Sequence, residues 1–184
     1  MFIQTEETPN PQVLKFIPDG KEVLKSGGEE FKSQKESATK SPLATQLFEI
    51  NGVTSVFLGT SFISITKNAD LEWEGLKADI QATIMDFFVS GKEVMFEKKE
   101  SADESQDDEV TKQIKELIEI KVRPAVAMDG GDIVFHEFKE GVVYLELKGA
   151  CSGCPSSTIT LKNGIENMLK HYVPEVESVE QVEN

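Results

Sequence analysis

Hydrophobic and polar residues alternate in four short stretches of the first 97 residues, which predicts four β-strands. Turn-forming residues separate the stretches, and Pro9 and Pro11 interrupt pairing between the first two. The candidate strands are residues 1–6, 12–18, 53–59 and 61–67. The first two are expected to pair through a hairpin-like connection.

Two helices are predicted in the same region. Ser41 followed by Pro42 is typical of an N-cap and a first helical position, so a short helix is expected to start there. A longer helix is expected from Trp73 to about Gly91, because large apolar residues recur every three or four positions. The polar residues 26–40 are expected to form a mobile loop. The region therefore predicts a small α+β domain.

The C-terminal part of the sequence predicts a second domain with the element order α-β-β-α-β. Apolar residues at helical spacing begin at Val110, and this helix is expected to end before Arg123, because Pro124 disfavours helix at that residue. Residues 132–138 and 142–149 alternate around a short turn and predict a hairpin. A second helix from Ser156 and a last strand at 176–182 complete the order. A three-stranded sheet covered on one face by two helices would bury the apolar residues of these helices and strands.

A block of acidic residues separates the two predicted domains. Residues 98–109 are rich in Asp and Glu and contain no apolar side chain larger than alanine. Such a segment buries too little surface to offset its ordering entropy, so it is expected to be an extended linker, with Asp108 or Glu109 as a cap for the next helix. The predicted organisation is an N-terminal domain at 1–97, the linker, and a second domain at 110–184.

Composition excludes some functions. The chain of 184 residues has a formal net charge of -14, which argues against nucleic acid as a partner because phosphate binding calls for a basic surface. No apolar run approaches the roughly 20 residues that span a bilayer, so no membrane partner is expected. The first residues lack the pattern of a secretory signal or an arginine-rich transit peptide. A reducing compartment is therefore expected, either a bacterial cytoplasm or, for a processed organellar form, the mitochondrial matrix.

Both cysteines of the chain, Cys151 and Cys154, lie in one loop, "GACSGCPSS". The loop follows a predicted strand and precedes a predicted helix, whose N-terminal N–H groups and dipole stabilise negative charge. Lys148 and Lys162 would add positive charge if their side chains point toward the loop. The location suits thiolates that are exposed at a surface.

Four interpretations of this cysteine pair compete. Structural zinc usually needs four ligands, and His136 and His171 lack suitable spacing from the pair. A thiol-disulfide oxidoreductase is possible, although a thioredoxin-like motif would open the helix of a β-α-β unit, which the predicted order is taken to lack. An inert pair is disfavoured by the position before a helix. The fourth interpretation is half of an iron-sulfur site, completed by two thiolates of a second chain.

The cysteine loop and its surroundings resemble a known family. The segments "MDGGDIVFHEF" and "LKGACSGCPSSTITLKNGIENMLKHYVPEV" resemble the C-terminal domain of the NifU or Nfu-type iron-sulfur scaffolds and carriers. The segments "FIQTEETPNPQVLKF", "SPLATQLFEINGV" and "VFLGTSFISITK" are similar to the N-terminal Nfu domain of the same family. Together the resemblances cover nearly all of the chain except the linker.

The resemblance implies a carrier and not an enzyme. It implies that Cys151 and Cys154 are cluster ligands and that a [4Fe-4S] cluster is shared by the two subunits of a homodimer. The cluster would come from upstream cluster-assembly proteins and would pass to apo iron-sulfur acceptor proteins, with clients selected by the N-terminal domain. The "DGGD" segment at 129–132 is expected to be a tight turn near the cluster without ligating it. A third functional hypothesis is an adaptor whose first domain does the work while the cysteine pair is incidental.

Overall fold

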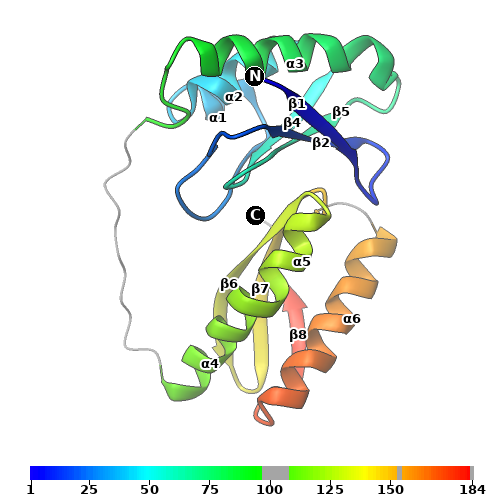
Figure 1. Ribbon diagram of the computed structural model, residues 1–184. Helices are drawn as coiled ribbons and strands as arrows, with labels where there is room; N and C mark the ends of the chain where they lie inside the picture. The colour runs from blue at the N-terminus through cyan, green and yellow to red at the C-terminus, as the bar shows by residue number, and fades with distance from the viewer. Residues whose placement is uncertain (97–107, 153–154, 183–184) are drawn as a thin grey trace. The chain divides into compact units, whose positions relative to one another are not determined.

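The computed structural model describes residues 1–96, 108–152 and 155–182, with only the backbone described at 155–157. The chain divides into two compact units, Met1–Lys99 and Glu100–Asn184. Both units combine helices with a small sheet, which confirms the predicted α+β fold with two domains (Figure 1). Most of the predicted linker lies outside the described residues. In the described ranges no helix is long and apolar enough to cross a membrane.

The N-terminal domain is built on a five-stranded antiparallel sheet with the order β1-β2-β5-β4-β3. Its elements are β1 (Ile3–Glu7), β2 (Val13–Pro18), β3 (Glu29–Phe31), α1 (Gln34–Ser37), α2 (Pro42–Phe48), β4 (Val53–Leu58), β5 (Ile63–Lys67) and α3 (Trp73–Val89). The four strands predicted from alternation are β1, β2, β4 and β5. The hairpin-like pairing of the first two is confirmed, with Ile3 opposite Pro18.

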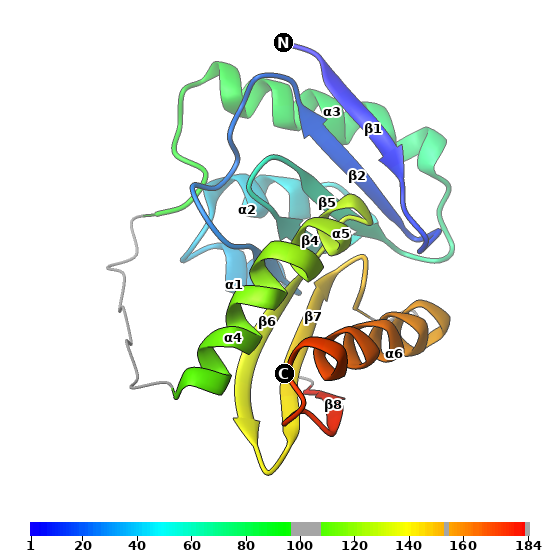
Figure 2. The ribbon, with the colours of Figure 1, turned by 60° about the horizontal axis from the view of Figure 1, so that its bottom comes forward.

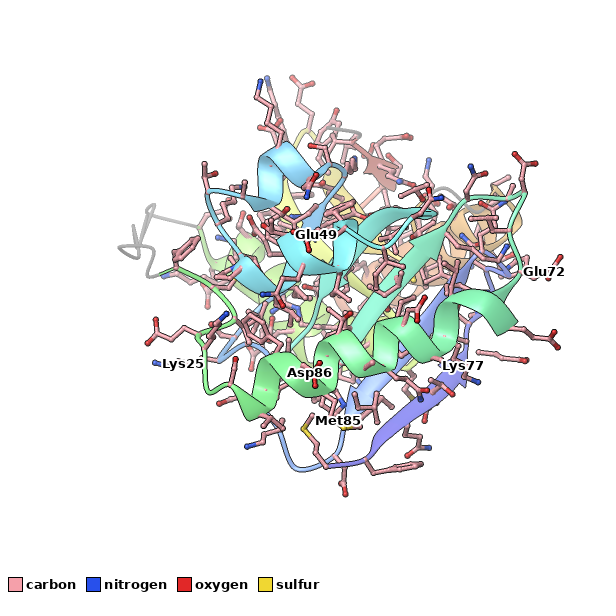
Figure 3. The ribbon with its side chains drawn as sticks, turned by 90° about the horizontal axis from the view of Figure 1, so that it is seen from above. Lys25, Glu49, Glu72, Lys77, Met85 and Asp86 are labelled. Carbon is pink, nitrogen blue, oxygen red and sulfur yellow. The ribbon has the colours of Figure 1, made fainter. Side chains whose placement is uncertain are left out.

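Both predicted helices of this domain are confirmed. Ser41 caps α2, because its hydroxyl oxygen accepts a hydrogen bond from the N–H of Ala44 at 3.2 Å. In α3 the apolar stripe of Leu76, Ile80, Ile84 and Phe87 is buried and packs on one face of the sheet. Figure 3 looks onto the opposite, solvent-facing side of α3, where Met85 and Asp86 are exposed.

The prediction of a mobile loop at residues 26–40 is wrong. The segment contains β3, which pairs with β4, and the short helix α1. Phe31 explains why, since it is fully buried in the domain core although it is the only large apolar residue of the segment. Ser33 then caps α1 by accepting from the N–H of Glu36 at 3.3 Å. One anchored side chain and one cap give structure to a stretch that is polar overall.

The C-terminal domain has a three-stranded sheet in the order β6-β7-β8. Its elements are α4 (Glu109–Leu117), the π-helical turn η1 (Ile118–Val122), α5 (Arg123–Met128), β6 (Gly131–Lys139), β7 (Val142–Gly149), α6 (Pro155–Tyr172) and β8 (Ser178–Gln181). Strands β6 and β7 form the predicted hairpin around a turn in which Glu140 and Gly141 both have positive φ. Asp108 is the N-cap of α4, as expected, and accepts from the N–H of Thr111 at 2.8 Å.

One apolar cluster fills this domain. Ile133, Leu147 and Val143 come from one face of the sheet, and Ile165 and Leu169 come from α6. The helical segment α4-η1-α5 contributes four further buried residues spaced by four, Ile114, Ile118, Val122 and Val126. The cluster therefore joins both helical segments to a single sheet.

The first helix of this domain does not end before Arg123 as predicted. Figure 2 shows α4 and α5 as one continuous rod, joined by η1. In an α-helix the ring of Pro124 would clash with the carbonyl of Ile120, four residues earlier. The π-turn relieves this clash, because the N–H of Arg123 bonds to the carbonyl of Ile118, five residues back. The rod therefore runs on to Met128, which lies just before the "DGGD" segment.

The expectation that this domain lacks a β-α-β unit is also wrong. Strand β8 pairs with β7 in parallel, with Val142 opposite Ser178 and Val143 opposite Val179. Strand β7, helix α6 and strand β8 therefore form a β-α-β crossover, and the cysteine loop opens its helix. Topology alone does not argue against an oxidoreductase.

Candidate metal centre

Cys151 lies two residues beyond the end of β7, at the point where the chain turns toward α6. Strand β7 is the central strand of its sheet, but β8 pairs only with Val142–Leu145, so the end of β7 that leads into the loop is paired with β6 alone. Cys154, the other predicted ligand, lies outside the described residues. Helix α6 begins at Pro155, one residue before the predicted start, and a proline suits the first helical turn because its missing N–H has no partner to lose there.

Gly131, at the start of β6, makes room for Cys151. A Cβ added to Gly131 would lie 2.7 Å from the Sγ of Cys151 and 2.6 Å from the carbonyl oxygen of Lys148. Both distances are too short for any residue with a side chain. The second glycine of "DGGD" is therefore required by the close approach of the cysteine side chain and of strand β7.

The first glycine of "DGGD" makes the turn. Gly130 has a φ of 81°, a left-handed conformation that favours glycine, and its N–H donates to the carbonyl of Ala127 at 3.1 Å. The carbonyl of Gly130 accepts in turn from the N–H of Ala150 at 3.1 Å. The expected tight turn is confirmed, and it is bonded directly to the residue before Cys151.

Two hydroxyl groups hold the loop, one from α6 and one from the loop itself. Thr158, in the first turns of α6, donates its hydroxyl to the carbonyl of Cys151 at 3.3 Å. Ser152 donates both its N–H, at 3.1 Å, and its hydroxyl, at 2.9 Å, to the carbonyl of Gly149. The backbone of Cys151 is thereby fixed between β7, the "DGGD" turn and α6.

One expectation about this loop is corrected. Cys151 was expected at the surface, but its residue is only 4% exposed and belongs to the apolar cluster of the domain. The reason is the missing side chain of Gly131, which lets the cysteine pack inward. The ammonium group of Lys162 lies 3.0 Å from the carboxylate of Glu180 on β8, so this lysine is engaged with a carboxylate of the last strand.

His136 lies in strand β6 of the hairpin, and His171 lies in the last turn of α6. The ring of His136 lies 3.0 Å from the carboxylate of Glu146 on the neighbouring strand β7. The ring of His171 packs edge-on against Tyr172 in the last turn of α6. Among the described residues no group of three or more His, Cys, Asp or Glu side chains could hold a metal ion.

The sequence did not predict the ion-pair network that lies at the start of β6. Arg123, the only arginine of the chain, donates its Nε to Asp132 at 3.0 Å and its Nη2 to the carbonyl of Ile133 at 3.2 Å. Asp132 is buried and is the residue next to Gly131. The network ties α5 to the start of β6, the strand against which Cys151 packs. A lone arginine beside a proline carries no pattern from which this contact could be predicted.

The chain is thus a protein of two α+β domains whose second domain carries a candidate thiol site in the loop before α6. Comparison with known families makes the assignment specific. The model of the scaffold protein Nfu/NifU N-terminal domain matches residues 3–91, and the model of the NifU-like domain matches residues 114–180. The chain belongs to the Nfu/NifU family of scaffold proteins, which confirms the resemblance found in its sequence.

Individual relatives agree with this assignment. The chain is 55% identical to a human protein described as a mitochondrial NFU1 iron-sulfur cluster scaffold homolog, over 99% of the chain and 72% of the human protein. It is 51% identical to a protein of Drosophila willistoni with the same description, over 99% of the chain and 64% of the relative. The chain thus spans between about three fifths and three quarters of the length of these relatives.

Solved structures of similar proteins cover parts of the chain. A NifU-like protein from Saccharomyces cerevisiae matches 53% of the chain and 87% of its own length, with 29% identity and a TM-score of 0.48. A protein from Staphylococcus aureus matches 46% of the chain and 99% of its own length, with 23% identity and a TM-score of 0.38.

Proposed function

We propose that this chain carries a [4Fe-4S] cluster held between two copies, each of which supplies Cys151 and Cys154, and delivers it to apo iron-sulfur proteins. The single observation that carries the proposal is the membership of the cysteine-bearing domain in the NifU-like family. The names of the relatives favour the mitochondrial matrix over a bacterial cytoplasm as the place of action.

The ligand count supports sharing between chains. A [4Fe-4S] cluster takes about four thiolates, one for each iron, and the chain has two cysteines. His136 is engaged with Glu146, and His171 lies at the far end of α6, which has 18 residues and is therefore roughly 27 Å long. Neither histidine is a good third ligand beside Cys151, so a second chain is needed.

Transfer is ligand exchange and requires no catalytic turnover by the chain. A cysteine thiol of the acceptor loses its proton and bonds to one iron, and the thiolate of Cys151 or Cys154 leaves that iron and takes up a proton. One iron–sulfur bond forms for each that breaks, and the cluster keeps its electrons. Upstream cluster-assembly proteins would load the carrier by the same exchange in reverse.

The test is the composition of anaerobically reconstituted protein. We expect about four irons and four sulfides for each two chains and a brown colour. Cys151→Ala and Cys154→Ala should each abolish the cluster, whereas His136→Ala and His171→Ala should leave it intact. A full cluster in a monomer, or a colourless protein that reduces disulfides, would contradict the proposal; the latter result would support the oxidoreductase.

A further inference from the structure

Two large apolar side chains are exposed on segments that are hydrogen-bonded to the cysteine loop. Met128, the last residue of α5, is 76% exposed, and Ile159, in the first turns of α6, is 62% exposed. The turn that follows Met128 accepts a hydrogen bond from Ala150, and the residue before Ile159 donates one to the carbonyl of Cys151. Both side chains therefore leave the backbone at segments that are bonded directly to the cysteine loop.

We propose that Met128 and Ile159 form the protein contact between the two copies of this chain that share a cluster. This inference rests on the proposed function. If each chain supplies half of the ligands, the two cysteine loops must face the same cluster. Exposed apolar side chains on the segments bonded to each loop are then placed to meet the partner copy. We name Met128 and Ile159 together the flanking pair.

The charge of the chain favours an apolar contact. Two copies with a net charge of -14 each repel one another, and a cluster with four thiolate ligands adds further negative charge. Apolar side chains at the point of closest approach bring no charge into the contact and gain free energy when water is removed from them. A contact made by acidic side chains would instead add to the repulsion.

The size of the flanking pair explains why the cluster is also needed. Stable interfaces bury roughly 1,200–2,000 Å² in total, which two side chains from each copy cannot supply. The flanking pair is therefore too small to hold two chains together by itself. It adds to the affinity that the shared cluster provides, so association should depend on both iron and these two side chains.

The chain offers a matched control. Ile120, on η1, is also 62% exposed, and it precedes Met128 by eight residues (128 minus 120), or roughly 12 Å along a helix. An exposed isoleucine of the same helical rod thus lies well away from the cysteine loop. Replacing it tests whether any exposed apolar residue affects association or only those beside Cys151.

The experiment measures self-association and cluster content on the same full-length samples. Met128→Asp and Ile159→Asp are reconstituted beside Ile120→Asp and the unaltered chain, and each is studied by anaerobic sedimentation over a range of concentrations. We expect at least a roughly tenfold weaker association for the first two and no change for Ile120→Asp. Circular dichroism of each variant before reconstitution checks that it is folded.

Photo-crosslinking keeps the proposal testable if an aspartate variant fails to fold. Benzoylphenylalanine in place of Met128 or Ile159 should link two copies only when the cluster is present, and in place of Ile120 it should not. Normal association of both aspartate variants, without such links, would overturn the inference even if every sample holds a cluster. In that case slower transfer by the variants would assign the flanking pair to acceptor docking. A protein without cluster in any sample would instead reject the proposed function.

Discussion

At the scale of single residues, the cysteine loop depends on a position that must lack a side chain. Gly131 contacts both the Sγ of Cys151 and the backbone of β7 so closely that even a methyl group does not fit. The carbonyl of Lys148 belongs to a paired strand and cannot move away without disturbing the sheet. The geometry of the site therefore depends on the missing side chain of Gly131 as much as on Cys151.

We predict that Gly131→Ala destabilises the C-terminal domain by about 1–3 kcal/mol and lowers cluster content. The added Cβ must push Cys151 or β7 out of place. Urea unfolding can follow this domain alone, because both tyrosines of the chain, Tyr144 and Tyr172, lie in it and the only tryptophan, Trp73, lies in the other. The tyrosine transition should shift to lower urea and the tryptophan transition should stay.

Gly164→Ala is the control for this prediction. Gly164 lies inside α6, and no atom is within 4 Å of the position that its Cβ would take. Alanine is favoured over glycine in a helix, so this change should stabilise the domain by about 0.5–1 kcal/mol. Equal effects of the two substitutions would show that the space beside Cys151 does not matter.

Sequence alone predicts which of these residues carry chemistry, but not how they pack. The spacing of Cys151 and Cys154, and the loop between a strand and a helix, follow from local pattern. The turn at Gly130 also follows, because positive φ is a local requirement. The role of Gly131 does not follow, since its neighbours are 17 and 20 residues away in the chain (148 minus 131, 151 minus 131).

At the scale of elements, α5 and β6 are joined by one network with a buried and an exposed branch. Arg123 bonds to Asp132, whose side chain is 7% exposed, and to Glu119, whose side chain is 60% exposed. The buried carboxylate also accepts from the N–H of Ile133 at 2.8 Å. Asp132 and Glu119 thus share the guanidinium group of Arg123 and differ in their access to water.

We predict that Asp132→Asn destabilises the domain by about 1.5–3 kcal/mol, because a hydrogen bond between charged groups is weakened in a buried place. Glu119→Gln removes a screened surface pair and should change stability by less than about 1 kcal/mol. The tyrosine transition in urea measures both. A larger effect of Glu119→Gln would mean that the exposed pair within the helical rod contributes more to stability than the buried bond from Arg123 to β6.

Helix α6 and strand β8 are joined by a carboxylate. Glu166 accepts from the ammonium group of Lys170 at 2.7 Å and from the N–H of Val179 at 3.1 Å. These two hydrogen bonds, the one from Lys170 first, lower the pKa of Glu166 from its ordinary value. The ionised carboxylate therefore holds the end of the crossover in place.

This shift predicts a pH dependence of stability. Because the folded-state pKa is depressed, the stabilisation is present above the pKa of the unfolded chain, about 4.3, and is lost as the pH falls through the folded value. The unaltered chain should lose more stability than Glu166→Gln when the pH is lowered from about 6 to about 3. Parallel pH profiles of the two proteins in tyrosine-detected unfolding would contradict this assignment.

The elements that the sequence mispredicts share a physical cause. Pro124 disfavours an α-helix locally, but a π-turn and four buried side chains of the rod override that preference. Segment 26–40 is polar, yet the burial of Phe31 orders it. In both cases tertiary packing outweighs a local tendency, which only a structure can show.

At the scale of the whole molecule, the candidate ligands are distributed unequally between the two domains. The NifU-like domain contains both cysteines and both histidines, and the N-terminal domain contains neither residue type. The matched family models cover both domains, while the acidic segment between them is outside either match. Domain boundaries at residues 97 and 110 remain a prediction from that acidity.

We predict that removing residues 1–97 leaves cluster binding unchanged and slows transfer to at least some acceptors. The remaining chain keeps both proposed ligands, whereas a surface that selects clients is lost. Reconstitution followed by transfer to two unrelated apo-proteins measures both effects, with the full chain as control. Identical transfer rates to every acceptor would leave the N-terminal domain without a role in client selection.

The central place of β7 has a consequence for local opening. This strand is paired with β6 over its whole length, but β8 pairs in parallel only with its first half, Val142–Leu145. Amide hydrogens of that half should exchange with deuterium only when the domain unfolds as a whole, while those of residues 146–149 and of the edge strands exchange through smaller fluctuations. The proposed cargo would then be handed on from a loop whose supporting strand is secured at its far half and can open locally at its near half.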